Sequence, residues 1–447
     1  MNKIKAWAEI VQNINTIDSG LYDRFSVKRG LRNKDGAGVL VGLTNVGEVH
    51  GYYVSEGEKI ATDGKLFYRG IDVEDIVANV AAEERYGFEE TIFLLLFGVL
   101  PAKAQLDEFC SYLASLRSLP PNFAEDVIMK HPSRNIMNEL CHSVLSLYSL
   151  DENPENFSVE NMIRQSIALI SRFPAIAAYA YRSKRHYFDK QSLIIHQLKD
   201  GRYTAETILS LIRRDQKFTR LEAETLDLAL ILHAEHGGGN NSTFAVHLVS
   251  STETDTYSAI AAGLCSLKGF KHGGANAKVM GMMKDLERHT SDWSDDEEVG
   301  AYLEKILRGE AHDHSGLIYG IGHAVYTISD PRTALLREKA KKLAQEKNFT
   351  REFELYTIVE RLAPVLIQKV KNINKEICAN VDLYSGFVYK MLDIPADLYT
   401  PLFAVSRVAG WCAHRLEEVV NGSRIIRPAY KCVQTHKKYI PLDSRDA

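Results

Sequence analysis

The stretch Leu226–Ser242, LDLALILHAEHGGGNNS, decides how the fold is interpreted. Its first half is almost entirely apolar, so we expect a helix that is buried on every side. The helix runs into His233 and His236, and the glycines that follow end it. A buried helix needs other helices around it, so the stretch predicts a largely helical domain.

The histidines at this helix end allow three interpretations. His233 and His236 can simply occupy the helix C-terminus, where cations are favoured. They can bind a metal with Glu235 between them, although the HExxH pattern is absent. His236 can also line a ligand pocket together with the open glycine backbone. The residues alone leave these alternatives open.

Outward from this stretch the pattern stays helical, except for a small β element near the N-terminus. The first ~20 residues have the apolar spacing of an amphipathic helix. Asp63-Gly64 is typical of a type I′ hairpin turn, and from Asp72 onward helical periodicity dominates. The expected strands are Val39–Val41, Val49–Val54, Lys59–Thr62 and Lys65–Tyr68.

Helix starts are predicted at three further places, and one helix end is predicted with them. The starts are Ser294 with Glu297 as a capping box, Asp330 with Pro331, and Thr400 with Pro401. Gly422 would end the last of these helices.

The composition is that of an ordinary globular protein and excludes several classes. The 447 residues suggest two domains. A net charge of −4 gives no reason to expect nucleic acid or an anionic membrane as a partner. No apolar stretch approaches the ~20 residues of a membrane span. Six cysteines without a CxxC pair suit reduced thiols, and Met1–Asn15 lacks a secretory core, so we expect a cytoplasmic protein.

Two glycine-flanked histidines are candidate catalytic groups. His272, in GFKHGGANA, precedes a predicted helix, whose dipole disfavours imidazolium. A neutral imidazole can polarise a carbonyl, although a mere turn is the alternative. His323 lies in GIGHAVY, which does not complete a dinucleotide-binding GxGxxG.

Four charged residues stand where local rules disfavour them. Arg332 falls in a first helical turn, where a cation opposes the dipole, and this indicates an anionic partner unless it is a tolerated surface residue. Asp382 lies between apolar residues and could act as a base or cap a helix. Arg407 and Arg427 follow apolar residues and need a carboxylate or phosphate, either internal or from a ligand.

Taken in order along the chain, these segments resemble the citrate synthase family. The matching motifs are HAEHGGGNNS, GFKHGGANA, GIGHAVY with DPR, NVDLYSG, FAVSR and RIIRP, and FYRGIDVEDI is similar near the N-terminus. The resemblance covers roughly residues 226–428. It implies a mainly α, two-domain fold in which residues 1–272 and 388–447 form a large domain and residues 273–387 a small one.

The resemblance also implies the reaction and the partners. Such an enzyme is an acyltransferase of the tricarboxylic acid cycle that condenses acetyl-CoA with oxaloacetate and water to citrate and CoA through an enol(ate). It would need no cofactor and no metal, and would work as a homodimer that closes over its substrates.

Roles follow residue by residue from the matching motifs. Asp382 resembles the base that takes the α-proton, His272 the donor to the thioester oxygen, and His323 the group that polarises the ketone. The residues that resemble the oxaloacetate clamp are His236, Arg332, Arg407 and Arg427, the last supplied by the partner subunit. The residues expected at the CoA site are Ile318, Tyr319, Gly320, Ile321, Gly322 and Asn380.

Some residues depart from the family pattern. Gly237 replaces a common Glu, Phe270-Lys271 replaces Pro-Leu, and Ala324 stands where many relatives carry Arg. These departures concern the contacts to CoA rather than the acid–base residues. A 2-methylcitrate synthase using propionyl-CoA is a close alternative, since one methylene in an apolar pocket is worth only ~1–3 kcal/mol. From other classes, we considered a metal-dependent hydrolase built on His233, Glu235, His236 and residues 312–314, and a non-catalytic helical scaffold.

Overall fold

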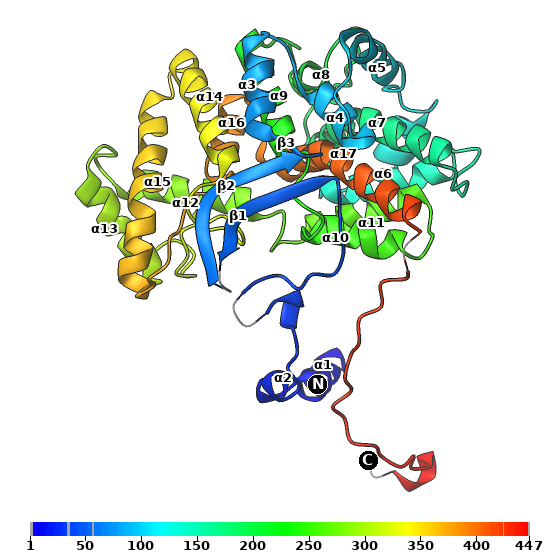
Figure 1. The fold of residues 1–447 in the computed structure, drawn as a ribbon, viewed down its shortest axis with the longest axis vertical. Helices are drawn as coiled ribbons and strands as arrows, with labels where there is room; N and C mark the ends of the chain where they lie inside the picture. The colour runs from blue at the N-terminus through cyan, green and yellow to red at the C-terminus, as the bar shows by residue number, and fades with distance from the viewer. Residues whose placement is uncertain (1–2, 34–35, 56–57, 423, 446–447) are drawn as a thin grey trace.

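The computed structural model describes residues 3–33, 36–55, 58–422 and 424–445 (Figure 1). Those residues form seventeen α-helices and one small three-stranded sheet. The mainly α prediction with a small N-terminal β element is confirmed. In the described part of the chain, no helix has both the length and the hydrophobicity that crossing a bilayer requires.

The helices up to residue 268 are α1 (Lys3–Asn15), α2 (Gly20–Arg24), α3 (Val73–Ala82), α4 (Phe88–Phe97), α5 (Lys103–Ser115), α6 (Ile136–Tyr148), α7 (Val159–Tyr187), α8 (Thr204–Ile212), α9 (Arg220–His233), α10 (Asn241–Ser250) and α11 (Thr256–Lys268). The later ones are α12 (Ala275–His289), α13 (Asp296–Leu307), α14 (Pro331–Lys347), α15 (Thr350–Lys371), α16 (Asp382–Met391) and α17 (Tyr399–Val420). Short helical turns are η1 (Arg29–Leu31), η2 (Ala124–Met129), η3 (Ala396–Leu398) and η4 (Leu442–Ser444).

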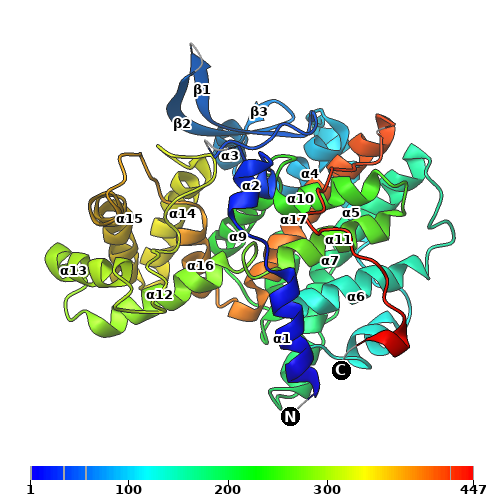
Figure 2. The same ribbon diagram turned by 90° about the horizontal axis from the view of Figure 1, so that it is seen from below.

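Helix α9 lies at the centre, as its apolar sequence predicts. Every residue from Leu226 to His233 is buried. The helix packs against α4, α8 and α17 on one side and against α14 and α16 on the other. Figure 2 shows α12–α16 gathered on one side of the molecule and α4–α7, α10 and α11 on the other. The C-terminal end of α9 therefore lies between these two groups of helices.

The sheet differs from the sequence-based expectation. Strand β1 (Gly47–Ser55) pairs antiparallel with β2 (Glu58–Tyr68), and β2 pairs with β3 (Ile71–Asp72). The turn predicted at Asp63-Gly64 is wrong, because both residues lie inside β2. In the register of the two strands, Ser55 instead pairs with Glu58.

Gly64 has a different role, which explains why the turn prediction was wrong. The β1–β2 register shifts between His50 and Tyr52, which makes a bulge around Gly64. A Cβ on Gly64 would collide with the carbonyl oxygen of Ser329 and would come within 2.6 Å of the Tyr326 ring. The glycine thus allows the loop after His323 to rest on the hairpin.

The strand predicted at Val39–Val41 is also wrong. This segment is loop, and the side chain of Leu40 is 84% exposed. Short apolar runs become strands only where a partner strand is available, and neither β1 nor β2 pairs with this segment.

The helix-end predictions were mostly correct. Asp330 accepts a hydrogen bond from the Arg332 amide and Pro331 opens α14. Helix α17 begins at Tyr399, and Gly422 follows its end with a φ of 58°. The capping box at Ser294 is wrong. Asp295 caps α13 by accepting from the amides of residues 297 and 298, since a carboxylate is the stronger acceptor there.

Candidate active site

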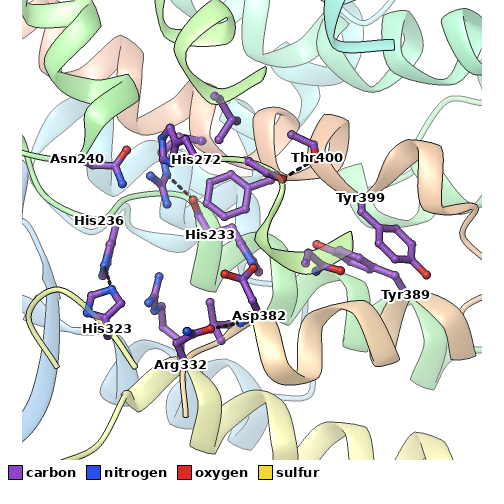
Figure 3. Close-up of a pocket in the computed structure, with 17 residues that line it drawn as sticks. His233, His236, Asn240, His272, His323, Arg332, Asp382, Tyr389, Tyr399 and Thr400 are labelled. Atoms are coloured by element: carbon purple, nitrogen blue, oxygen red, sulfur yellow. Dashed lines mark hydrogen bonds between the residues drawn. The ribbon is translucent and has the colours of Figure 1, made fainter. Parts of the chain in front are cut away.

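A cavity of about 170 Å³ lies at the centre of the molecule (Figure 3). Its walls come from the end of α9, the turn before α12, the start of α14, both ends of α16 and the first half of α17. The structure brings together side chains that are far apart in sequence. The predicted site residues that line this cavity are His236, His272, His323, Arg332, Asn380, Asp382 and Arg407.

The tautomer of His323 is fixed by the backbone. Its Nδ1 accepts hydrogen bonds from the amides of Val325 and Tyr326, both at 3.1 Å. The ring hydrogen must therefore be on Nε2, which lies 3.0 Å from Nε2 of His236. His323 donates and His236 accepts, so the hydrogen of His236 is on Nδ1, for which the described residues offer no partner.

Both imidazoles are uncharged. Burial, assisted by the neighbouring Arg332, lowers the pKa of His323 to about 4 and that of His236 well below its usual value. A neutral His323 with its hydrogen on Nε2 is a hydrogen-bond donor that faces the cavity. A ligand oxygen that displaced His236 could accept from it.

His272 lies in the tight turn before α12. Thr400 Oγ1 donates to the carbonyl oxygen of Gly273 at 2.9 Å, and a Cβ on Gly273 would collide with the backbone of Leu267. Burial, with a smaller effect of Arg407, lowers the pKa of His272 to about 4. Burial thus favours the neutral imidazole that the sequence predicted. Its Nε2 is buried without a partner in the described chain.

Asp382 is the first residue of α16 and faces the cavity (Figure 3). Burial raises the pKa of its carboxyl to about 6, against the opposing effect of Arg332 and with a contribution from Asp330. The helix-cap alternative fails, because no side chain caps α16. A carboxylate with this pKa is a stronger base than a solvated one.

The two arginines of the cavity differ in their partners. Arg332 forms a two-pronged ion pair with Asp330, with nitrogen–oxygen distances of 3.0 and 2.7 Å. Arg407 is fully buried and donates only through Nε, to the carbonyl oxygen of His233 at 2.6 Å. Its two terminal nitrogens are buried and have no partner among the described residues. Two such donors on a buried cation call for an anion.

Arg427 is not brought to this cavity. It is exposed on the tail that follows α17, and Figure 1 shows this tail leading away from the body beside α1 and α2. The fold of a single chain therefore does not support a role for Arg427 in that chain's own cavity.

The predicted CoA residues form a short backbone ladder. Ile321 pairs with Ala379, and Asn380 donates through its amide to Gly320 and through Nδ2 to Gly322. The ladder ties the segment before His323 to the segment before Asp382. Asn380 lines the cavity, whereas residues 318–322 do not.

Sequence reasoning missed several residues of the site. Tyr326 packs on His323, and Asp330 pairs with Arg332. Asn276 lines the cavity with a buried Oδ1 that lacks a partner in the described chain. A signal existed for each, since all three lie inside the motifs GFKHGGANA and GIGHAVY or in the DPR triplet, but their side chains suggested no chemistry of their own.

The metal-site interpretation finds no support. Glu235 turns away from the cavity toward His414, at 3.0 Å, and His233 Nδ1 bonds the carbonyl of Ala229 in its own helix. Across the described ranges, no three His, Cys, Asp or Glu side chains are arranged to hold a metal ion.

Comparisons with known proteins agree with this geometry. The family model "Citrate synthase, C-terminal domain" matches residues 36–429. A citrate synthase of Haloferax volcanii is 32% identical over 94% of this chain and 99% of its own length. A 2-methylcitrate synthase of Shewanella oneidensis is also 32% identical, over 85% of this chain and 92% of its own.

Solved structures give the same match. A citrate synthase of Pyrobaculum aerophilum superposes with a TM-score of 0.74 at 29% identity, covering 93% of this chain and 95% of the other. A citrate synthase of Thermoplasma acidophilum, solved with carboxymethyl coenzyme A and oxaloacetate, has a TM-score of 0.74 at 26% identity, over 94% and 99% of the two chains. The citrate-synthase-like fold expected from the sequence is confirmed.

Proposed function

This chain belongs to the citrate synthase family of acyltransferases, and we propose that it joins the acetyl group of acetyl-CoA to oxaloacetate, giving citrate and CoA. Arg407 carries this proposal. Its two free terminal nitrogens lie in a cavity with a hydrogen-bond donor, His323, and a base, Asp382. A small dianion with a ketone satisfies Arg407 and His323, and the α-proton of an acyl-CoA gives Asp382 its substrate.

The first step is removal of an α-proton. Asp382 takes the proton from the methyl group of acetyl-CoA, and Nε2 of a neutral His272 donates to the thioester oxygen. The α-proton is far less acidic than a carboxylic acid, so a base and an oxyanion donor must act together. The product of this step is an enol(ate) whose carbon is the nucleophile.

The second step forms the carbon–carbon bond. Arg407, Arg332 and His236 hold the carboxylates of oxaloacetate, and His323 Nε2–H points to the ketone oxygen. The enol(ate) carbon attacks the ketone carbon, and the Nε2–H of His323 stabilises the resulting alkoxide by a hydrogen bond. The alkoxide is protonated and Asp382 releases the proton that it removed, so that both side chains return to their starting state. Water then cleaves the thioester, which releases citrate and the CoA thiol.

A thiol-release assay tests the function directly. Oxaloacetate with acetyl-CoA should release CoA, and a chelator should not change the rate because no metal takes part. No thiol release from any pair of acyl-CoA and 2-oxo acid would refute the proposal, and loss of activity with chelator would favour the hydrolase alternative.

The second candidate is 2-methylcitrate synthesis from propionyl-CoA, the activity named for the Shewanella oneidensis relative. The residues that would contact the acyl chain are the same in both reactions, and a methylene changes transition-state binding by only ~1–3 kcal/mol. The ratio of kcat/KM for propionyl-CoA and acetyl-CoA decides between them. A ratio above one would assign the chain to the second reaction.

We further propose that the working form is a homodimer in the cytoplasm. Arg427 is exposed on a tail that leaves its own cavity, which suits a residue delivered to the partner subunit. Helix α1 also exposes apolar side chains that water disfavours, namely Trp7, Ile10, Val11 and Ile14, each at least 57% exposed. The six cysteines are all free thiols, as a reducing compartment requires.

Mixed dimers test the donation of Arg427. We expect Arg427→Ala and Arg407→Ala proteins each to be nearly inactive alone at the oxaloacetate concentration that half-saturates the wild type. After the two are unfolded and refolded together, half of the dimers are mixed and each mixed dimer has one intact site. About a quarter of the wild-type activity should therefore return. No recovery would mean that Arg427 acts within its own chain or not at all.

A further inference from the structure

Four titratable side chains form a continuous hydrogen-bonded chain behind the cavity. Glu235 Oε1 lies 3.0 Å from Nε2 of His414, and His414 Nδ1 lies 3.1 Å from Nε2 of His247. His247 Nδ1 lies 2.6 Å from Oε2 of Glu418. We call these residues the Glu–His–His–Glu chain. None of them lines the cavity.

The Glu–His–His–Glu chain is enclosed by the fold. The side chains of Glu235 and His414 are completely buried, and those of His247 and Glu418 are 12% exposed. Glu235 fits only because two glycines face it. A Cβ on Gly410 would collide with its Oε2, and a Cβ on Gly47 would come within 2.7 Å of its Cγ.

The number of hydrogens on the two imidazoles of the Glu–His–His–Glu chain follows from its hydrogen bonds. Ionised carboxylates only accept, so the outer two bonds need hydrogens on His414 Nε2 and His247 Nδ1. The bond between the imidazoles needs a third hydrogen. Two neutral imidazoles carry only two, so complete bonding requires one imidazolium.

Two carboxylates, Glu235 and Glu417, lie within 4 Å of His414, and one, Glu418, lies within 4 Å of His247. Burial and the neighbouring His414 lower the pKa of His247, against the effect of Glu418. The pKa of the Glu235 carboxyl is lowered although burial opposes this, because His414 and Arg407 face it. Glu417 also faces the chain, with its Oε2 3.9 Å from His414 Nδ1.

The Glu–His–His–Glu chain contacts segments that carry residues of the candidate active site. Glu235 Oε1 also accepts from the amide of Gly237 at 2.5 Å, so it holds the peptide that follows His236. Gly238 lies over the imidazole pair, because its Cβ position is 3.5 Å from His247 Nε2. Helix α17 carries both His414 and Arg407.

We propose that Glu235, His414, His247 and Glu418 form a proton-holding chain that positions His236 relative to Arg407, so that oxaloacetate binding requires the extra proton of the imidazole pair. These are positioning residues, since none touches the substrate. The inference rests on the proposed function for its ligand, but the proton count does not.

Two substitutions and one control test the positioning role. His414→Gln and His247→Gln each remove the extra proton, and His289→Gln changes an exposed histidine that also faces a carboxylate, Asp285. We expect the KM for oxaloacetate to rise roughly tenfold in the first two, with kcat nearly unchanged, and to stay at the wild-type value in the control.

The pH dependence separates this role from a merely structural one. In the wild type the proton is lost as the pH rises, so the KM for oxaloacetate should increase at alkaline pH. In His414→Gln this increase should disappear, because no proton remains to be lost. A KM that is unchanged in both variants, or an alkaline increase that persists in His414→Gln, would overturn the proposal.

A direct measurement does not depend on activity. Nitrogen NMR of the full-length protein with labelled histidine should detect one imidazolium that resists exchange at neutral pH and that is absent in His414→Gln. If His414→Gln does not fold, Glu418→Gln provides the same test from the other end. If wild-type protein releases no CoA, the proposed function fails while this spectrum still decides the proton count; two neutral imidazoles would refute the chain.

Discussion

Tyr326 stacks on His323, with ring centroids 4.6 Å apart and ring planes inclined by 23°. The Tyr326 hydroxyl donates to the carbonyl oxygen of Lys65, inside β2, at 3.3 Å. The N-terminal hairpin therefore supports the loop that carries a candidate catalytic group, although about 260 residues separate them along the chain. The orientation of His323 depends on this contact.

Substitution of Gly64 by alanine should disturb this support. The added Cβ would collide with Ser329 and press on Tyr326, so we expect kcat to fall roughly ten- to hundredfold as His323 is misplaced. The matched control is Gly42→Ala, because Gly42 has open space around its Cβ position. Equal kcat values in the two variants would show that the hairpin does not position His323.

Substitution of Asp382 by asparagine should remove the base and leave the shape of the cavity intact. We expect kcat to fall by about 10²–10⁴-fold, the usual contribution of general base catalysis. Calorimetry should find oxaloacetate binding nearly unchanged. Asp393→Asn is the control, since this exposed residue has a φ of 54°, which asparagine tolerates. Normal turnover in Asp382→Asn would contradict the assignment of the base.

The acidic side of the pH profile should report Asp382. Its carboxyl must be ionised to act, and its pKa is raised to about 6, so activity is lost as the pH falls through that value. His272 and His323 stay neutral down to about pH 4 and should not contribute. We expect kcat/KM for acetyl-CoA to fall tenfold per pH unit below pH ~6. A flat profile to pH 5 would exclude a base with this pKa.

Two buried arginines on α17 should respond in opposite ways to replacement by leucine. In Arg407→Leu the KM for oxaloacetate should rise roughly a hundredfold, because two charge-assisted hydrogen bonds are lost. The melting temperature of the ligand-free protein should not fall, since a buried cation with unpaired nitrogens is costly.

Arg415→Leu is the matched control on the same helix. Arg415 is also buried, but all its nitrogens have partners: Thr256, Ser250 and the carbonyl of Thr254. Arg415→Leu should reduce the free energy of unfolding by about 1–3 kcal/mol and so lower the melting temperature. It should leave the KM for oxaloacetate unchanged. If both variants lose stability equally, Arg407 has a structural partner rather than a ligand.

Sequence reasoning predicted those features that depend on neighbours along the chain. The cap at Asp330 and the buried helix ending at His233 follow from local rules and are confirmed. That His272, His323 and Asp382 come together was predicted only from the family resemblance, because hydrophobic periodicity does not show which segments meet in the fold. The use of Gly64 could not be predicted, since it depends on Ser329, far along the chain. The partner of Glu235 on α17 was hidden for the same reason.

Helix α17 fixes the relative orientation of Arg407 and His414 through the number of residues between them. Arg407 and His414 are seven residues apart, which is about two helical turns, so both side chains leave the helix on nearly the same side. A single residue inserted between them would rotate one by about 100° relative to the other. Proteins that share this cavity should therefore tolerate changes of residue type in this segment far better than changes of its length.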